Sequence, residues 1–196
     1  MLTLAASPTL VNYSGTTTLS GKLSDSSCSV TNQTVTVRRS ANGGSSWTQD
    51  GTATYDAASS AYKASRTLTA NTTFQFRFAG NGSSKASISP KALVQARAYL
   101  TQPVTPTAVN RNTSFTTYGY LKPYHSGYTT AYFYRYYLGA WRYYAAVNAP
   151  NASYSGYTRY SLSYKLPYPG SWYVRAYHAD ANHAATWSPI IQFTVR

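Results

Sequence analysis

The chain has 196 residues, of which 17 are Lys or Arg and four are Asp, while Glu is absent. Glycoside hydrolysis uses paired carboxylates, and the four acids Asp25, Asp50, Asp56 and Asp180 are scattered along the chain. Asp180 is the only acid in the second half, and no Ser, His and carboxylate set assembles around it. We therefore expect no enzyme active site and no cofactor.

The formal net charge of +13 predicts attraction to polyanions, which include nucleic acid, anionic glycans, anionic cell-wall polymers and membrane surfaces. Cys28 is the only cysteine, so the chain forms no internal disulfide. This cysteine content is compatible with an exported bacterial protein. The sequence has no apolar run long enough to span a bilayer, and we expect no membrane span.

The first predicted strand covers residues 18–23, whose side chains alternate as in a half-buried strand. Residues 116–121 repeat that pattern in the second half of the chain. The next predicted strand covers residues 33–39, and its counterpart covers residues 129–135. In both halves a turn that contains glycine follows and leads to a tryptophan, which is the pattern of a hairpin.

A shared interval places two further strands in each half. Phe74 lies six positions after Leu68, and Trp172 lies six positions after Leu166. From each of these aromatic residues onward, alternate side chains should point into the core. A final strand covers residues 191–195, where Ile, Phe and Val alternate with polar residues.

The same pattern of strands therefore occurs twice along the chain, which is typical of an internal repeat. The sequence predicts an all-β protein of two tandem sandwich domains, residues 1–95 and residues 96–196, with a short linker or none. About a hundred residues suit one sandwich of this kind. The first domain has the character of a spacer, and the second is rich in Tyr and Arg.

Residues 19–23, 39–47 and 68–80 resemble the bacterial immunoglobulin-like repeat domains that form arrays on secreted and cell-surface proteins. The second half resembles them more loosely, because tyrosine replaces the serine and threonine of the outward positions. The resemblance implies an immunoglobulin-like fold and a secreted or cell-surface location. It does not imply a particular ligand.

Tyrosine is concentrated in the second half, which holds 18 of the 21 tyrosines. In an immunoglobulin-like sandwich the strands at residues 129–135 and 172–177 are neighbours, so their outward side chains share one face. Two residues of the next strand, Arg142 and Tyr144, are expected to extend this face. The predicted ligand-binding residues are Tyr132, Tyr134, Tyr136, Arg142, Tyr144, Tyr173, Arg175 and Tyr177.

Tyrosine rings stack on the C–H face of a sugar, and arginine recognises carboxylate, sulfate or phosphate. The same two residue types are enriched at protein interfaces, and cross-strand aromatic pairs also stabilise an exposed sheet. Tyr118, Tyr120 and Lys122 should face outward from the opposite sheet. Aromatic coverage is therefore expected on both sides of the second domain.

The segment from His178 to His183 carries metal-ligand chemistry, since two imidazoles and the carboxylate of Asp180 could meet around an ion. The corresponding segment of the first half, residues 79–83, reads as an ordinary polar turn. We therefore expect a turn here and no metal, with His178, Asp180 and His183 as weak candidate ligands.

The leading hypothesis is a noncatalytic extracellular binding or adhesion module that recognises a glycan or an anionic surface polymer. The alternative is a structural subunit of a cell-surface fibre or array, in which the tyrosine face self-associates. Nonspecific nucleic-acid binding ranks lower, because basic residues are spread across both domains.

Overall fold

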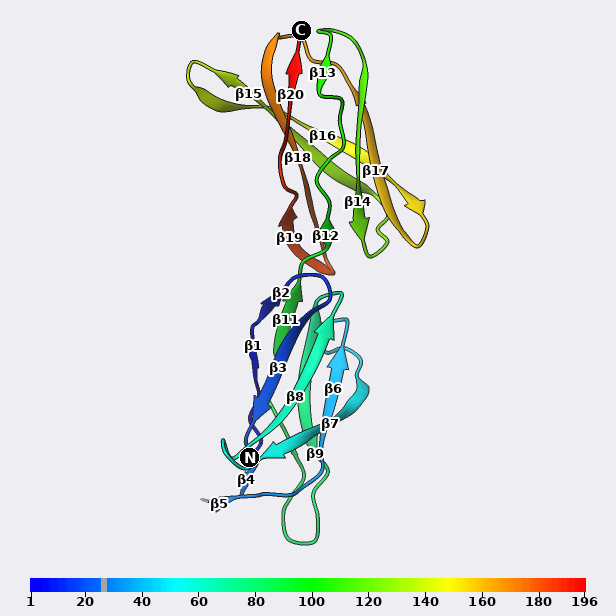
Figure 1. Cartoon of the computed structure of the whole chain (residues 1–196). Helices are drawn as coiled ribbons and strands as arrows, with labels where there is room; N and C mark the ends of the chain where they lie inside the picture. The colour runs from blue at the N-terminus through cyan, green and yellow to red at the C-terminus, as the bar shows by residue number, and fades with distance from the viewer. Residues whose placement is uncertain (26–27) are drawn as a thin grey trace. The chain divides into compact units, whose positions relative to one another are not determined.

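The computed structural model describes residues 1–25 and 28–196, and the side chains of Cys28 and Ser29 lie outside the description. The described residues form β-strands and no helix, and hence contain no helix able to cross a membrane. They divide into two compact units, Met1–Arg97 with Asn182–Ala184, and Ala98–Ala181 with Ala185–Arg196. Each unit is an immunoglobulin-like β-sandwich, as the sequence predicts (Figure 1).

The strands of the first unit are β1 (Ala5–Ser7), β2 (Leu10–Val11), β3 (Gly15–Gly21), β4 (Ser24–Asp25), β5 (Cys28–Ser29), β6 (Val35–Ser40), β7 (Thr48–Asp56), β8 (Ala61–Leu68), β9 (Thr72–Phe78), β10 (Ser87–Ile88) and β11 (Ala92–Ala96). Their main order is β1-β3-β8-β7-β6-β9-β11-β2. Strand β7 pairs first with β6 and then with β8, so it passes from one layer of the sandwich to the other.

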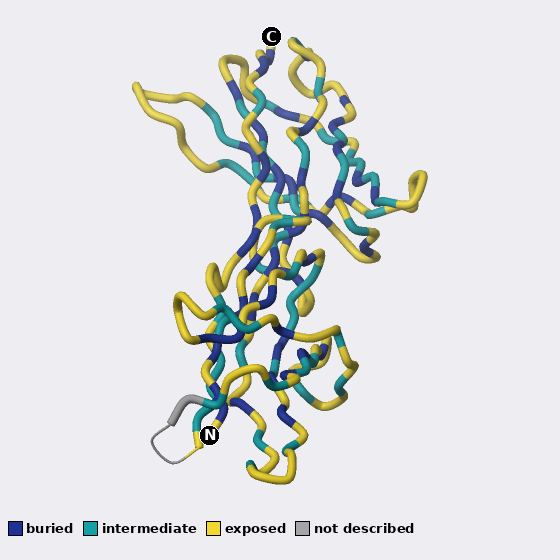
Figure 2. The backbone as a smooth tube through the Cα atoms, turned by 60° about the horizontal axis from the view of Figure 1, so that its bottom comes forward, coloured by how far each residue is buried: buried dark blue, intermediate teal, exposed yellow. Residues whose placement is uncertain are grey.

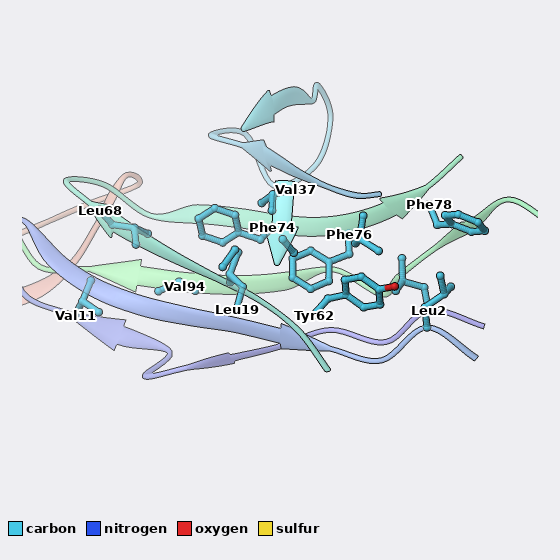
Figure 3. Packing of buried hydrophobic residues seen from close by; sticks show 14 of the residues in the cluster. Leu2, Val11, Leu19, Val37, Tyr62, Leu68, Phe74, Phe76, Phe78 and Val94 are labelled. Carbon is cyan, nitrogen blue, oxygen red and sulfur yellow. The ribbon is translucent and has the colours of Figure 1, made fainter. Parts of the chain in front are cut away.

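The predicted inward positions fill the core of the first unit. Leu19 of β3 and the three phenylalanines of β9 are buried between the layers, where they pack with Tyr62 and Leu68 of β8 (Figure 3). Lys22 is exposed, as alternation along its strand requires. The period-two pattern therefore assigns the faces of these strands correctly.

The strands of the second unit are β12 (Tyr99–Leu100), β13 (Ala108–Val109), β14 (Phe115–Lys122), β15 (Tyr128–Tyr137), β16 (Ala140–Tyr154), β17 (Tyr157–Tyr164), β18 (Gly170–Asp180), β19 (His183–Trp187) and β20 (Ile191–Val195). The order is β12-β14-β17-β16-β15-β18-β20-β13, with β19 beside β18. The long strand β16 pairs with β15 and then with β17, so it repeats the layer switch of β7.

Trp172 is fully buried at the centre of the second unit, and its indole N–H donates a hydrogen bond to the carbonyl of Tyr168 at 3.0 Å. Phe133 and Val174 pack with it from the neighbouring strands β15 and β18. These are positions that the repeat predicts to point inward. Buried and exposed residues alternate along the strands of both units (Figure 2).

The hairpin of β15 and β16 has two local features that shape its surface. Its turn places Leu138 and Gly139 at φ values of 50° and 77°, the left-handed pair that a two-residue type I′ turn needs. Between Phe133 and Tyr134 the register of β15 against β16 shifts by one residue, which marks a β-bulge. The turn end of the hairpin extends away from the rest of the sandwich (Figure 1).

Candidate functional site: an aromatic face on β15, β16, β18 and β19

Outward side chains of β15 and β18 form the centre of the site. In the antiparallel register Tyr134 lies opposite Tyr173, and Tyr132 lies opposite Arg175. The rings of Tyr134 and Tyr173 are stacked, with centroids 4.6 Å apart and planes at 18°. The structure thus brings together the tyrosines that the sequence assigns to this face.

From the central stack, ring contacts continue toward the turn of the hairpin. Trp141 of β16 meets Tyr173 edge to face at 4.8 Å between centroids. Tyr136 then contacts Trp141 at 5.3 Å, and the two residues are paired across the strands. Edge-to-face geometry at these separations is favourable for aromatic pairs.

Ring contacts also continue in the other direction, toward β19. Tyr143 bridges Tyr134 and Tyr132, with centroid distances of 5.9 Å and 6.3 Å. Trp187 of β19 lies 4.8 Å from Tyr132 and 4.6 Å from Tyr177. The complete set, called the aromatic ladder below, is Tyr136, Trp141, Tyr173, Tyr134, Tyr143, Tyr132, Tyr177 and Trp187.

Arg175 lies within the ladder. Its guanidinium carbon is 3.9 Å from the ring centroid of Trp187 and 5.4 Å from that of Tyr134. One terminal nitrogen also donates a hydrogen bond to the Tyr134 hydroxyl at 3.3 Å. These cation–π contacts hold the Trp187 ring and place a positive charge among the rings of the ladder.

Exposure differs along the ladder. Tyr136, Trp141, Tyr143 and Trp187 are 47%, 36%, 59% and 41% exposed. The other four rings are half-buried, because they support one another. The exposed rings are therefore the ones able to stack on a bound molecule, and the half-buried ones hold them in place.

Two predicted members of this face lie elsewhere. Tyr144 packs edge to face on the buried Trp172, with centroids 4.9 Å apart, and it joins the core. Arg142 pairs with Arg135, one residue out of phase with Tyr134 and Tyr136. The two-residue turn causes both corrections, because it pairs Trp141 with Tyr136 and Tyr143 with Tyr134, which leaves Arg142 and Tyr144 on the other face of β16.

Sequence reasoning also missed three ladder members, Trp141, Tyr143 and Trp187. The first two depend on the register that the two-residue turn sets, which places them opposite Tyr136 and Tyr134. Trp187 lies on β19, a strand beside β18 that the sequence patterns do not predict.

The opposite sheet of the same unit carries a second aromatic cluster, as predicted. Tyr120 contacts Tyr118, Tyr154 and Tyr157 at centroid distances of 6.1, 5.4 and 5.6 Å. Lys122 lies 5.0 Å from the centroid of Tyr157. The second unit therefore presents aromatic rings with basic side chains from both of its sheets.

The environment of Tyr173 favours its neutral form. Burial raises the pKa of Tyr173, the neighbouring Tyr134 raises it further, and Arg175 opposes the shift. The hydroxyl of Tyr173 therefore stays protonated at neutral pH and keeps its capacity to donate a hydrogen bond. A ligand at this face meets the Tyr173 hydroxyl together with the guanidinium of Arg175.

The candidate metal ligands are arranged differently from the prediction. His178 and Asp180 do lie together, but the third member of the group is His125, from the loop between β14 and β15, and not His183. Asp180 Oδ2 lies 3.2 Å from the Nε2 atom of each of the two imidazoles. Two nitrogen donors and one carboxylate could hold a metal ion.

Comparisons with known proteins give the following results. No protein-family model and no curated protein matches the chain. A solved structure described as a marsupial T cell receptor aligns at TM-score 0.37 and 10% identity, covering 98% of this chain and 72% of that one. An ICAM-5 D1–D4 ectodomain fragment aligns at TM-score 0.45 and 9% identity, covering 100% and 53%.

A tetra-tandem repeat from the extending region of a large adhesion protein aligns at TM-score 0.47 and 18% identity, covering 100% of this chain and 49% of that one. The chain thus spans about half the length of this structure and of the ICAM-5 fragment. At these levels of similarity the alignments carry no information about a ligand.

Proposed function

We propose that the chain is a noncatalytic extracellular binding module whose second unit recognises a glycan or an anionic surface polymer through the aromatic ladder. The observation that carries this proposal is the continuous row of rings, four of them solvent-accessible, built around Arg175. The rings are held by one another, so little side-chain freedom is lost when a ligand stacks on them.

The charge of the second unit supports an anionic or neutral ligand over a cationic one. Residues 98–196 contain eight Lys or Arg and a single acid, Asp180. A sugar can use the ring faces, while its carboxylate or sulfate groups gain from the surrounding positive field. On this proposal the first unit acts as a spacer, and the location is secreted or cell-surface.

Self-association in a surface fibre or array is the second candidate function. The observation that favours it is the presence of aromatic clusters on both sheets of the second unit. Two different aromatic faces on one unit permit heterologous, head-to-tail contacts between copies, which generate open filaments when they do not close into a ring. Nonspecific binding to nucleic acid would use the charge alone and would weaken steeply with salt.

The test is a panel of neutral and acidic polysaccharides and single-stranded DNA, probed with the purified chain at physiological and raised salt. A double variant, Tyr143→Ala with Trp187→Ala, removes two exposed rings from the ladder. We expect saturable binding to one glycan class, lost in the folded variant. Concentration-dependent assembly without glycan binding would instead establish the fibre subunit, and salt-sensitive DNA binding that the variant retains would establish the charge alone.

A further inference from the structure

A carboxylate lies between two buried imidazoles in the second unit. Asp180 is exposed at the end of β18, whereas His125 and His178 are buried, and their ligand atoms all lie within 4.8 Å of one another. We propose that His125, His178 and Asp180 form a binding site for a divalent metal ion of the zinc class. This site is separate from the aromatic ladder, and the inference does not depend on the function proposed for it.

The hydrogen bond of His125 defines its protonation. Its Nδ1 atom lies 2.6 Å from the carbonyl oxygen of Pro123, and a carbonyl only accepts, so Nδ1 carries the proton. In the neutral ring the lone pair is then on Nε2, which faces Asp180 Oδ2 at 3.2 Å. Two acceptors at this distance repel, and a cation bound to both makes the contact favourable.

This arrangement is the one that metal-binding histidines use. Such a histidine donates one ring N–H to a backbone carbonyl or a carboxylate, which fixes the ring and directs the other nitrogen at the ion. Pro123 supplies that carbonyl for His125. The acceptor of the ring proton is therefore already in place beside the candidate ligand.

The distances in the trio suit a small ion. Ligand atoms bound tetrahedrally to zinc at about 2.0 to 2.1 Å are roughly 3.3 Å apart. The two nitrogen–oxygen distances of 3.2 Å match this edge. His178 Nδ1 is buried and has no hydrogen-bond partner within the described part of the chain, so a small rotation of this ring toward the ion changes only the contact of its Nε2 atom with Asp180.

The loop that carries His125 is anchored before any ion binds. The backbone N–H of His125 donates to Thr158 Oγ1 at 2.7 Å, and this hydroxyl donates back to the His125 carbonyl at 3.1 Å. Strand β17 thus holds the loop next to the end of β18. Little ordering is left for the metal to impose, which favours binding.

The donor set selects the class of ion. Two imidazoles and one carboxylate suit Zn²⁺ and its first-row neighbours, whereas Ca²⁺ and Mg²⁺ require mainly oxygen ligands. A fourth position remains for water, since the exposed carboxylate of Asp180 gives solvent access to the trio. An ion here would tie the β14–β15 loop to β18 and stabilise the folded second unit.

The test uses the full chain, with any histidine tag removed and metal stripped by chelator. Titration with ZnCl₂ should show one ion bound per chain, and Co²⁺ should give the visible absorption of a four-coordinate site. Zinc at about a hundred times its Kd should raise the folded-to-unfolded ratio about a hundredfold, measured by thermal unfolding.

Matched variants assign the ligands. Asp180→Asn, which keeps the size of an exposed side chain, and His125→Gln should each weaken zinc binding by at least about tenfold. His183→Gln removes the remaining histidine of the chain and should leave binding unchanged. The proposal is overturned if folded wild-type protein takes up no zinc, which is the result expected if His125 is an imidazolium paired with Asp180. It is also overturned if Asp180→Asn binds zinc as tightly as wild type does.

Discussion

Gly119 of β14 marks a place where two strands allow no side chain. It pairs with Tyr160 of β17, and a Cβ atom on Gly119 would lie 2.1 Å from the Tyr160 hydroxyl oxygen. The first unit repeats the pair, with Gly21 opposite Tyr62. The space above Gly119 is filled by Tyr160, whereas the space above Gly21 is filled by the backbone of Thr3 and the ring of Phe76.

We predict that Gly119→Ala destabilises the second unit by about 1 to 3 kcal/mol, because the buried Tyr160 ring must move to make room. Urea denaturation monitored by tyrosine and tryptophan fluorescence measures this change. Gly82→Ala is the matched control, since a Cβ atom there meets nothing within 4 Å. Equal stabilities for the two variants would contradict the packing described.

A second prediction concerns Asp56 at the turn between β7 and β8. The hydrogen bond from Lys63, at 2.6 Å, and then that from Ser59 lower the pKa of this carboxyl from 3.8 to about 2. Because the folded pKa is the lower one, the stabilisation is present above the unfolded pKa and is lost as pH falls through the folded pKa. Asp56→Asn should therefore be less stable than wild type at pH 7, and the difference should shrink as the pH falls toward and through 2.

Chemical denaturation at a series of pH values checks this window. Lys63→Gln should reproduce the effect, because it removes the same ion pair from the other side. A stability difference between wild type and Asp56→Asn that stays constant from pH 7 to pH 2 would show that the carboxylate charge plays no part.

At the scale of the element, the turn of the β15–β16 hairpin contains one unfavourable residue. Leu138 is 76% exposed and has a φ of 50°, a region that asparagine tolerates better than leucine. We predict that Leu138→Asn stabilises the second unit by about 0.5 to 1 kcal/mol. Thermal unfolding compares it with Leu138→Ala, which lacks a polar side chain able to hydrogen-bond the local backbone and should bring no such gain.

The same hairpin shows where sequence patterns stop being informative. Alternation along β15 correctly predicts that Tyr132 and Tyr134 face outward. It fails on β16, because the register set by the two-residue turn places Tyr143 opposite Tyr134 on the outside and directs Tyr144 into the core. This register belongs to the pair of strands, so alternation within either strand alone does not reveal it.

The metal-ligand trio was partly visible in the sequence. His178 and Asp180 are two residues apart on one strand, and such side chains share a face. His125 is distant in sequence, yet β15 and β18 are antiparallel, with Thr130 opposite Tyr177. The residues just before β15 therefore meet the end of β18, and only that pairing register reveals the third ligand.

At the scale of the whole molecule, the repeat made the fold predictable. Inward positions inferred for Phe74 and Trp172 are buried in both units, and the expected neighbouring strands are paired. Two copies of one pattern constrain each other, which compensates for weak signals in short strands. Ligand identity has no such constraint, because ring stacking serves a sugar, a nucleobase and a protein alike.

The measurement that tests the central claim most directly is the affinity of Trp187→Ala for the best polysaccharide, beside Trp47→Ala as control. Trp47 belongs to the first unit and also lies under cationic side chains, with Arg38 5.4 Å from its ring centroid. If the aromatic ladder is the binding surface, Trp187→Ala weakens binding by at least about tenfold, or 1.4 kcal/mol, and Trp47→Ala leaves it unchanged. Equal affinities for both variants and wild type would place binding outside the ladder and contradict the account.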